Sequence, residues 1–441
     1  MLNLKKAALH NLGCKVNAYE TQAMEEMLEN AGYSIVDFDE KADVYIINTC
    51  SVTNIADRKS RQMIHKCKKL NPNSCVVATG CYVQNFGKNE KETLGADIIL
   101  GNNLKNRLIE ELDEFFKKNE CIVNCIDIND GFVDYEYMNI TKDAEHTRAF
   151  VKVQDGCNQF CTYCIIPFAR GRVRSRDIND VKKELEALAK AGYKEVVITG
   201  IHLSSYGLNE GYDLCELLEM AQKIEGIERI RLGSLEPQII TEEFAGRIQK
   251  LSKLCPHFHL SLQSGCDTVL KRMNRKYSSN EYKKGCDILR KTFRNPAITT
   301  DVIAGFPGET EDEFNITFDF VKDISFYEMH VFPYSKRAGT KAASMSGQLN
   351  NVIKKERANK LIQLADAMSD EYRKGFVGDK LSVLFEEITL IEGKEYYVGY
   401  SREYLKCALP ANNHNCRVNE LLEVKAVSYD LCNKYVFVEI C

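Results

Sequence analysis

Short apolar runs alternate with amphipathic stretches along the first hundred residues of this chain. The runs predict strands over 6–12, 42–48, 75–79 and 97–100. A helical pattern begins at Asn17, which we expect to be its N-cap, and Gly32 ends it. Because strands and helices alternate, the pattern predicts a mostly parallel sheet with helices on its faces.

The alternation is interrupted from about residue 118 to residue 147, where polar and breaking residues such as Asp130 and Gly131 accumulate. A second α/β series follows. Its strands are predicted over 149–153, 195–199, 229–232, 257–262, 298–303 and 327–332. Six strand–helix repeats predict an incomplete barrel.

The last part of the chain has a third pattern. A long charged helix is predicted over 351–374, and short segments follow over 380–385, 395–400, 405–409, 422–426 and 435–440. Five short strands predict a small β-barrel of the oligonucleotide-binding kind. The fold class is therefore α/β with a small β-barrel at its end. We expect a parallel α/β domain over 1–117, a linker over 118–147, a partial (β/α)6 TIM barrel with its C-terminal helix over 148–375 and the β-barrel over 376–441.

Composition narrows the class of protein. The chain has 441 residues, a formal net charge of −4 and a pI near 6.2, so any contact with nucleic acid must come from local basic patches. The start of the chain lacks an apolar segment of signal-peptide length, and no stretch reaches the roughly 20 apolar residues of a membrane span. We therefore expect the 18 cysteines to lie in the reducing cytoplasm, where clustered thiols indicate metal ligands.

Three cysteines lie within eight residues, Cys157, Cys161 and Cys164, directly after the first predicted barrel strand. Active sites of such barrels form at the carboxyl ends of the strands. A structural zinc needs four ligands, and the next cysteine is Cys215. A 4Fe-4S cluster with one open iron fits three thiolates better than zinc does.

Three further cysteines, Cys14, Cys50 and Cys81, each follow a predicted strand of the first sheet. The carboxyl ends of parallel strands meet at one edge, so these three side chains can share a second cluster. Gly13 and Gly80 precede two of them and would let the backbone approach an inorganic core. The alternative from spacing alone is that these cysteines are inert residues in turns. The remaining twelve lack such placement, and we interpret them as small buried hydrophobic residues.

The sequence resembles the methylthiotransferases of the radical S-adenosylmethionine (SAM) superfamily over nearly its whole length. The resemblance is carried by NLGCKVN at 11–17, NTCSVT at 48–53, TGC at 79–81, DGCN at 155–158, GFPGE at 305–309 and FPYS at 332–335. It implies two 4Fe-4S clusters, SAM as cofactor and a C-terminal TRAM-like RNA-binding domain. One departure is Thr199-Gly-Ile-His202, where many radical SAM enzymes have a Gly-Gly-Glu-like turn that holds the SAM amino group.

Within that family the sequence looks like the branch that acts on N6-threonylcarbamoyladenosine beside the tRNA anticodon. GCKVN at 13–17 and IIPFARGRVRSR at 165–176 carry this likeness. The nearest alternatives are isopentenyladenosine in tRNA and a ribosomal-protein aspartate as substrates. An alternative of another class is an iron–sulfur protein that binds RNA without catalysis.

The family resemblance implies a radical mechanism, because adenine C2 carries a strong, non-acidic C–H bond. SAM bound to the open iron of the Cys157, Cys161 and Cys164 cluster would be cleaved reductively to a deoxyadenosyl radical, while a second SAM would methylate sulfur at the other cluster. An electron donor such as flavodoxin or ferredoxin is implied, and the sulfur donor is unknown. Position at the strand ends and resemblance assign the SAM pocket to Tyr163, Ser234, Glu236, Gln263, Gly305 and Gly308.

Two basic runs are candidates for the tRNA contact. Arg170, Arg172, Arg174 and Arg176 follow the cysteines and could present guanidinium forks to phosphate or to the threonylcarbamoyl carboxylate. Arg58, Lys59, Arg61, Lys66, Lys68 and Lys69 form the second run, for which a solvated helix face is the alternative. The final domain has seven Lys and Arg against ten Asp and Glu, so RNA contact there would need tyrosines such as Tyr396, Tyr397, Tyr400 and Tyr404, which could equally be core and rim.

Overall fold

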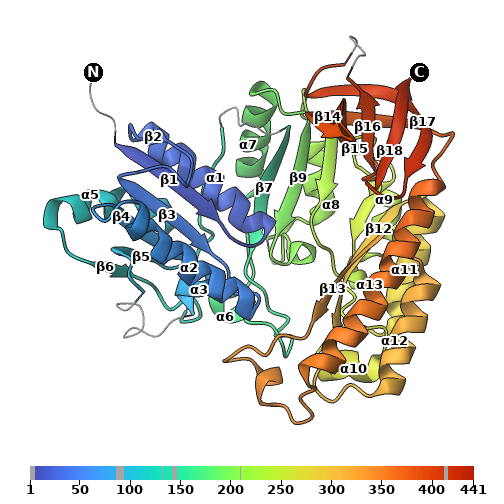
Figure 1. Ribbon diagram of the computed structural model, residues 1–441, viewed down its shortest axis with the longest axis horizontal. Coiled ribbons are helices and arrows are strands. Elements are labelled where there is room, and N and C mark those ends of the chain that lie inside the picture. Colours follow the sequence, from blue (N-terminus) through green and yellow to red (C-terminus); the bar gives the residue numbers. More distant parts are fainter. Residues whose placement is uncertain (1–4, 86–93, 132, 142–146, 209, 412–415) are drawn as a thin grey trace.

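The computed structural model describes residues 5–85, 94–131, 133–141, 147–208, 210–411 and 416–441. Its first part is a six-stranded parallel sheet in the order β2-β1-β3-β4-β5-β6 (Figure 1). The strands are β1 (Lys6–Asn11), β2 (Ser34–Ile35), β3 (Val44–Thr49), β4 (Cys75–Gly80), β5 (Ile98–Leu100) and β6 (Ile122–Asn124). The helices are α1 (Lys15–Asn30), α2 (Asn54–Leu70), α3 (Cys81–Gln84), η1 (Lys105–Arg107) and α5 (Leu108–Lys118). The predicted parallel α/β sheet is confirmed.

Two details of this sheet differ from the prediction. Helix α1 begins three residues earlier than expected, with Cys14 as N-cap, and the Asn17 side chain instead donates hydrogen bonds to the carbonyls of Leu12 and Thr49. Asn17 therefore ties the helix to two loops. In addition, β6 lies in the segment expected to be a linker and pairs with β5, because Ile122 and Val123 can extend the sheet. Residues 132 and 142–146 of that segment lie outside the described residues.

The second part has six parallel strands. Strands β10-β9-β7 and β11-β12-β13 pair within two sheets, and the bridges Ile230–Leu254 and Leu235–Leu260 join them. The strands are β7 (Arg148–Asp155), β9 (Glu195–Gly200), β10 (Arg229–Leu232), β11 (His257–His259), β12 (Ala297–Ala304) and β13 (Glu328–Pro333). At one edge β7 pairs instead with the short antiparallel β8 (Arg174–Ser175), so the barrel is incomplete, as the six repeats predicted.

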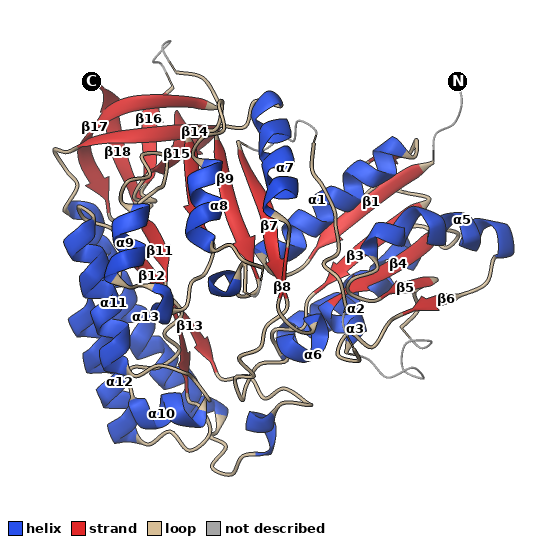
Figure 2. Ribbon diagram, turned by 180° about the vertical axis from the view of Figure 1, so that it is seen from behind, coloured by secondary structure: helices blue, strands red, loops and turns tan. Residues whose placement is uncertain are grey.

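Helices cover the outside of this partial barrel (Figure 2). They are α7 (Ile178–Lys190), α8 (Leu214–Ala221), α9 (Glu242–Ile248), α10 (Asp267–Arg272), α11 (Ser279–Thr292), α12 (Glu311–Ile324) and α13 (Asn351–Lys374), with 3-10 turns η2 (Leu203–Ser205), η3 (Pro237–Ile239) and η4 (Lys341–Ser344). The short α6 (Ile166–Arg170) lies instead beside α3 of the first part. Asp213, Ser278 and Thr310 begin α8, α11 and α12 with capping boxes. Such caps fix where these helices begin.

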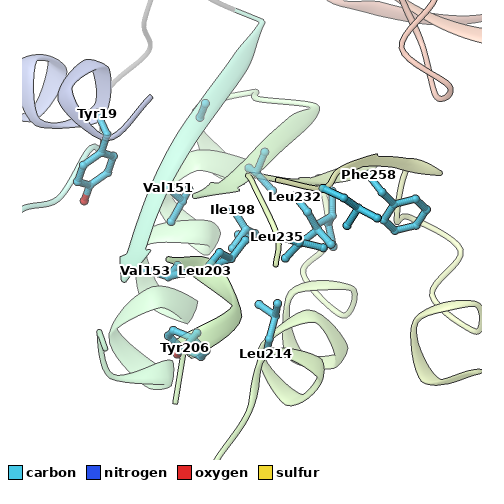
Figure 3. Packing of buried hydrophobic residues seen from close by; sticks show 14 of the residues in the cluster. Tyr19, Val151, Val153, Ile198, Leu203, Tyr206, Leu214, Leu232, Leu235 and Phe258 are labelled. Carbon is cyan, nitrogen blue, oxygen red and sulfur yellow. The ribbon is translucent and has the colours of Figure 1, made fainter. Parts of the chain in front are cut away.

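The core of the barrel lies between its strands and these helices. Val151 of β7, Ile198 of β9 and Leu232 of β10 are almost fully buried and point to the same side (Figure 3). In each strand, the side chains of the residues directly before and after the named one therefore point the other way, into the barrel. Among these inward residues are Lys152 and Arg231, which makes the interior polar.

The last part is a closed five-stranded barrel in the order β14-β15-β16-β18-β17. The strands are β14 (Lys380–Ile391), β15 (Lys394–Ser401), β16 (Lys406–Pro410), β17 (Glu420–Asp430) and β18 (Tyr435–Ile440). It contacts the amino ends of the partial barrel's strands, where Arg229 and Arg231 donate to carbonyls of Tyr400 and Ser401. No helix among the described residues is long and apolar enough to cross a membrane.

Candidate active site

The loop with Cys157, Cys161 and Cys164 follows β7 at the carboxyl end of the barrel and is held from two sides. The Cys157 N–H donates to the Gly171 carbonyl at 3.0 Å, and the Thr162 N–H donates to the Met273 carbonyl at 3.0 Å. The Asn274 amide donates to the carbonyl of Phe160 at 2.9 Å. These bonds fix the loop before any cofactor binds.

Arg275 links this loop to the third barrel strand. One guanidinium nitrogen lies 3.3 Å from Cys161 Sγ, and another donates to both Glu236 oxygens at 2.6 and 2.8 Å. Glu236 was expected to contact SAM, and the structure places it at the cysteine loop as the partner of Arg275. Sequence reasoning missed Arg275, because an arginine in a short segment after a helix carries no recognisable motif.

Burial dominates the titration of the cysteines in this loop. It raises the pKa of the Cys157 thiol to about 11 and that of Cys164 to about 12, with Cys161 adding to both shifts. Thiols with such pKa values are protonated at neutral pH unless a cation replaces the proton. The donor set therefore suits a metal cluster better than a free nucleophile.

Of the other residues expected at the SAM pocket, Ser234 and Gln263 follow strands and Tyr163 lies in the cysteine loop. Ser234 follows β10 and is exposed, and Gln263 follows β11 with a left-handed φ of 69°. Tyr163 lies edge-on to the Phe306 ring, with centroids 6.4 Å apart. Their side chains stay candidates for SAM contacts.

Gly305 and Gly308 lie in a turn after β12 and both have positive φ, at 74° and 73°. The Glu309 carboxylate accepts hydrogen bonds from the Gly305 and Phe306 N–H groups and pairs with Arg357 of α13 at 2.7 Å. This turn is therefore shaped by a buried ion pair that the GFPGE pattern did not reveal.

His202, in the segment where many radical SAM enzymes have a Gly-Gly-Glu-like turn, also lies at the cysteine loop. Its ring nitrogens lie 2.6 Å from Ser205 Oγ and 3.3 Å from the Gln159 amide nitrogen, and its Nε2 is 3.9 Å from Glu236. Burial lowers the pKa of His202. A neutral imidazole thus occupies the position after β9.

Cys14, Cys50 and Cys81 meet at the carboxyl edge of the first sheet. A Cβ added to Gly13 would lie only 2.9 Å from Cys50 Sγ, which places the loops of β1 and β3 in contact. A Cβ on Gly80 would lie 2.5 Å from the Thr49 carbonyl, and both glycines have positive φ. The strand order thus brings together three cysteines that are 36 and 31 residues apart in sequence.

Two buried polar atoms at this edge have no hydrogen-bond partner, Asn48 Oδ1 and Thr79 Oγ1. Each precedes a cysteine of the set by two residues, and such orphaned groups indicate a missing ligand. Among the described residues, no three His, Cys, Asp or Glu side chains converge as a single-ion site. Each cysteine of a cubane binds a different iron, so three thiolates suit a cluster with one open iron, whereas a structural zinc takes four ligands.

Helix α1 lies between β1 and β7 in both views (Figures 1 and 2), so the first sheet faces the open side of the barrel. Glu20 on α1 forms ion pairs with Lys152 of β7 at 2.7 Å and with Arg170 at 2.8 Å. Although burial opposes ionisation, Arg170 and Lys105 hold the pKa of Glu20 well below its usual range. A buried ionic contact thus joins the two cysteine-bearing parts.

The structure corrects our interpretation of the arginine run. Arg170 and Arg176 are fully buried, the first beside Glu20 and Asp155 and the second beside Glu184, so neither can reach a substrate. Arg174 is also buried, with Asp155 as its partner. Arg172 is exposed, stacks on the Phe160 ring at 4.5 Å and remains a candidate for substrate contact.

The basic helix and the tyrosines are also partly used by the fold. Lys66 pairs with Asp39 and Lys68 with Asp97, while Arg58, Lys59 and Lys69 are exposed. Arg61 is exposed too, although it donates to the Tyr82 hydroxyl at 2.9 Å. Tyr404 stacks on His257 of the partial barrel and on Tyr400. Tyr400 and Tyr404 are therefore interface residues, and Tyr396 and Tyr397 pack against the small barrel's core.

The chain also matches known families and proteins. Residues 151–321 match the radical SAM superfamily and residues 6–101 match the uncharacterized protein family UPF0004. The chain is 42% identical over 402 residues to the threonylcarbamoyladenosine tRNA methylthiotransferase MtaB of Bacillus subtilis, covering 90% of this chain and 89% of the relative. The chain belongs to the radical SAM tRNA methylthiotransferases. As a member, it uses a 4Fe-4S cluster and SAM.

Two further relatives of this methylthiotransferase are named for two different substrates. The MtaB of Aquifex aeolicus is 40% identical, with 91% of this chain and 97% of the relative covered. The tRNA-2-methylthio-N(6)-dimethylallyladenosine synthase of Clostridium tetani is 36% identical, with 85% and 84% covered. The radical SAM methyltransferase TsrM of Kitasatospora setae shares the fold at 14% identity, with a TM-score of 0.56 over 77% of this chain and 74% of that structure.

Proposed function

We propose that this methylthiotransferase adds a methylthio group to C2 of N6-threonylcarbamoyladenosine at position 37 of tRNA. The two relatives with 42% and 40% identity carry that activity in their names, whereas the dimethylallyladenosine synthase is 36% identical. Threonylcarbamoyl differs from dimethylallyl in carrying a carboxylate. An enzyme for the former substrate needs a free cation beside its reacting centre.

Two cations beside the cysteines supply the observation that carries the proposal. Lys15 directly follows Cys14, is exposed and forms no ion pair with another described residue. Desolvation and the charges of Arg148 and Arg231 lower the pKa of Lys15, so its side chain lies near the barrel strands. Arg172 likewise has no carboxylate partner among the described residues. Both would meet the threonylcarbamoyl carboxylate.

We assign the radical-generating 4Fe-4S cluster to Cys157, Cys161 and Cys164, and a second 4Fe-4S cluster to Cys14, Cys50 and Cys81. When bound, these groups supply the reductive cleavage of SAM and the sulfur that is transferred. The protein's own task is to fix the two cysteine sets relative to each other. It does so through α6, which begins two residues after Cys164 and packs against α3, whose first residue is Cys81.

Around the barrel cysteines, the chain's residues orient SAM. Glu236 is held by Arg275, and the Gly305–Gly308 turn is held by Glu309, so both present fixed hydrogen-bonding groups at the strand ends. Tyr163, Ser234 and Gln263 complete the proposed pocket. Fixing these groups in advance reduces the entropy lost when SAM binds.

The tRNA anticodon loop is the proposed macromolecular partner. Arg58 and Lys59 lie near the start of α2, four and five residues after Asn54, which contacts the segment after β13. These two exposed cations follow Cys50 in the chain. There they can contact the phosphates of a bound loop. We further propose a cytoplasmic location and a one-electron donor such as flavodoxin or ferredoxin.

Mass spectrometry of tRNA nucleosides from a strain that lacks this gene tests the proposal. We expect loss of the methylthiolated threonylcarbamoyladenosine and accumulation of its unmethylthiolated precursor. Loss of methylthiolated isopentenyladenosine instead would support the alternative substrate, and an unchanged nucleoside profile would favour a non-catalytic RNA-binding role.

A further inference from the structure

Arg170 occupies an unusual position between the two cysteine sets. It is the last residue of α6 and is completely buried. Its Nε lies 3.3 Å from Cys81 Sγ, and its terminal nitrogens donate to Asn17 at 2.6 Å, to Glu20 at 2.8 Å and to Asp155 at 3.1 Å. The sulfur is thus one of four groups that share this guanidinium.

The ion network around Arg170 does not balance its own charge. Among the described residues, the cations Lys105, Lys152, Arg170 and Arg174 form ion pairs with two carboxylates, those of Glu20 and Asp155. Each of the six side chains is at most 6% exposed. Four cations against two anions leave an excess of two positive charges in a buried place, where an uncompensated charge is costly.

The thiols of the first sheet are the neighbouring groups that can offset this excess. The charge of Arg170 acts on Cys14 and Cys50 as well as on Cys81. A second donor, the Asn102 amide, lies 3.7 Å from Cys81 Sγ and is itself held by Lys105 at 2.7 Å. The network therefore reaches the cysteine set by hydrogen bonds and by field.

The barrel cysteines have a different environment. Arg275 also lies 3.3 Å from a sulfur, that of Cys161, but Glu236 neutralises it in a two-oxygen pair. The comparison isolates what is special about Arg170, namely a sulfur contact combined with a net-positive surrounding.

We infer that Arg170 is a tuning residue for the cluster of Cys14, Cys50 and Cys81, whose more negative, reduced form it stabilises. The inference rests on the proposed second cluster. Hydrogen bonds to sulfur and net charge both set the reduction potential of iron–sulfur clusters, and added positive charge raises it. Arg170 would hold this cluster's potential above the value that the cysteines alone would give.

The test uses the full chain with Cys157, Cys161 and Cys164 changed to Ala, so that one cluster remains after anaerobic reconstitution. In this background we would compare Arg170→Met with Arg176→Met by iron content and by a redox titration followed by electron paramagnetic resonance. Arg176 is the matched control, since it is equally buried and pairs with Glu184, away from the cysteines.

We expect Arg170→Met to lower the midpoint potential by about 59 mV, a tenfold change for a one-electron couple, and Arg176→Met to leave it unchanged. Lys105→Met, which removes one network charge without touching a sulfur, should give a smaller downward shift and serves if Arg170→Met does not fold. If the midpoint potential is unchanged in folded, iron-loaded Lys105→Met or Arg170→Met protein, the inference is wrong and the proposed second cluster still stands. Absence of iron from the parent background overturns the proposed second cluster and the inference with it.

Discussion

Arg337, in the segment after β13, forms an ion pair with Asp57 of α2 at 2.6 Å, although the two residues are 280 positions apart in sequence. The same guanidinium donates to Ser51 Oγ at 2.8 Å, directly beside Cys50. The pair therefore fastens the first sheet to the barrel edge opposite α6. Together the two attachments set the spacing between the cysteine sets.

Breaking this pair should separate the two half-reactions. In Arg337→Met the barrel cysteines are untouched, so formation of 5′-deoxyadenosine from SAM should continue while methylthiolated nucleoside falls at least about tenfold, because small misplacements are costly in transfer steps. Chromatography of both products from one reaction gives the ratio. Equal loss of both products in folded protein would show that the pair does not control the spacing.

Iron content tests the two-cluster assignment. We expect Cys157, Cys161 and Cys164 changed together to Ala to leave about half of the iron after anaerobic reconstitution, since each set supplies three thiolates to one cluster. The reciprocal change of Cys14, Cys50 and Cys81 should leave the other half. Full retention of iron in either variant, or zinc in the parent protein, contradicts the assignment.

Cluster retention at the barrel should depend on pH. Burial raises the pKa of Cys157 to about 11 and of Cys164 to about 12, and a thiol must release its proton to bind iron. Protons therefore compete with iron at neutral pH, and affinity should increase as pH rises toward those values. We would follow iron loss to a chelator between about pH 6.5 and 8.5, anaerobically. A rate of loss that is flat or increases with pH is the contrary result.

Substrate discrimination should depend on Lys15 and Arg172. A hydrogen bond to a charged group contributes about 1.5–3 kcal/mol, so Lys15→Gln and Arg172→Ala should each weaken threonylcarbamoylated tRNA binding roughly 10- to 150-fold. Binding of tRNA without the modification should change far less. Affinities for both tRNAs at one salt concentration give the comparison, with Lys69→Gln, at an exposed position near the end of α2, as a distant control. Equal losses for both tRNAs would reduce these residues to phosphate contacts.

The sequence predicted the architecture because its signals are local. Alternating apolar runs located the six barrel strands and the sheet edge that gathers Cys14, Cys50 and Cys81. Side-chain partners are non-local, which is why Arg170 and Arg176 were interpreted as substrate contacts although they are buried beside Glu20 and Glu184. The alternate positions of the arginines in 170–176 do not show which of their side chains point into the protein.

The same limit applies to Arg275, Arg337 and Asn17. Arg275 and Arg337 act on partners that are 39 and 280 residues away, and Asn17 lies one turn inside the helix that it was expected to cap. The domain limits at 117, 147 and 375 stay predictions, although β6 shows that the first sheet draws on residues beyond 117.

The most direct test of the account is a competition between two tRNA substrates in one reaction. Reconstituted protein with SAM and a reductant would receive equal amounts of threonylcarbamoylated and isopentenylated tRNA, with Cys50→Ala as the control. We predict that nucleoside mass spectrometry finds the methylthio group on threonylcarbamoyladenosine, and that Cys50→Ala forms 5′-deoxyadenosine without it. Methylthiolation of isopentenyladenosine alone, or product formation by Cys50→Ala, would contradict the account.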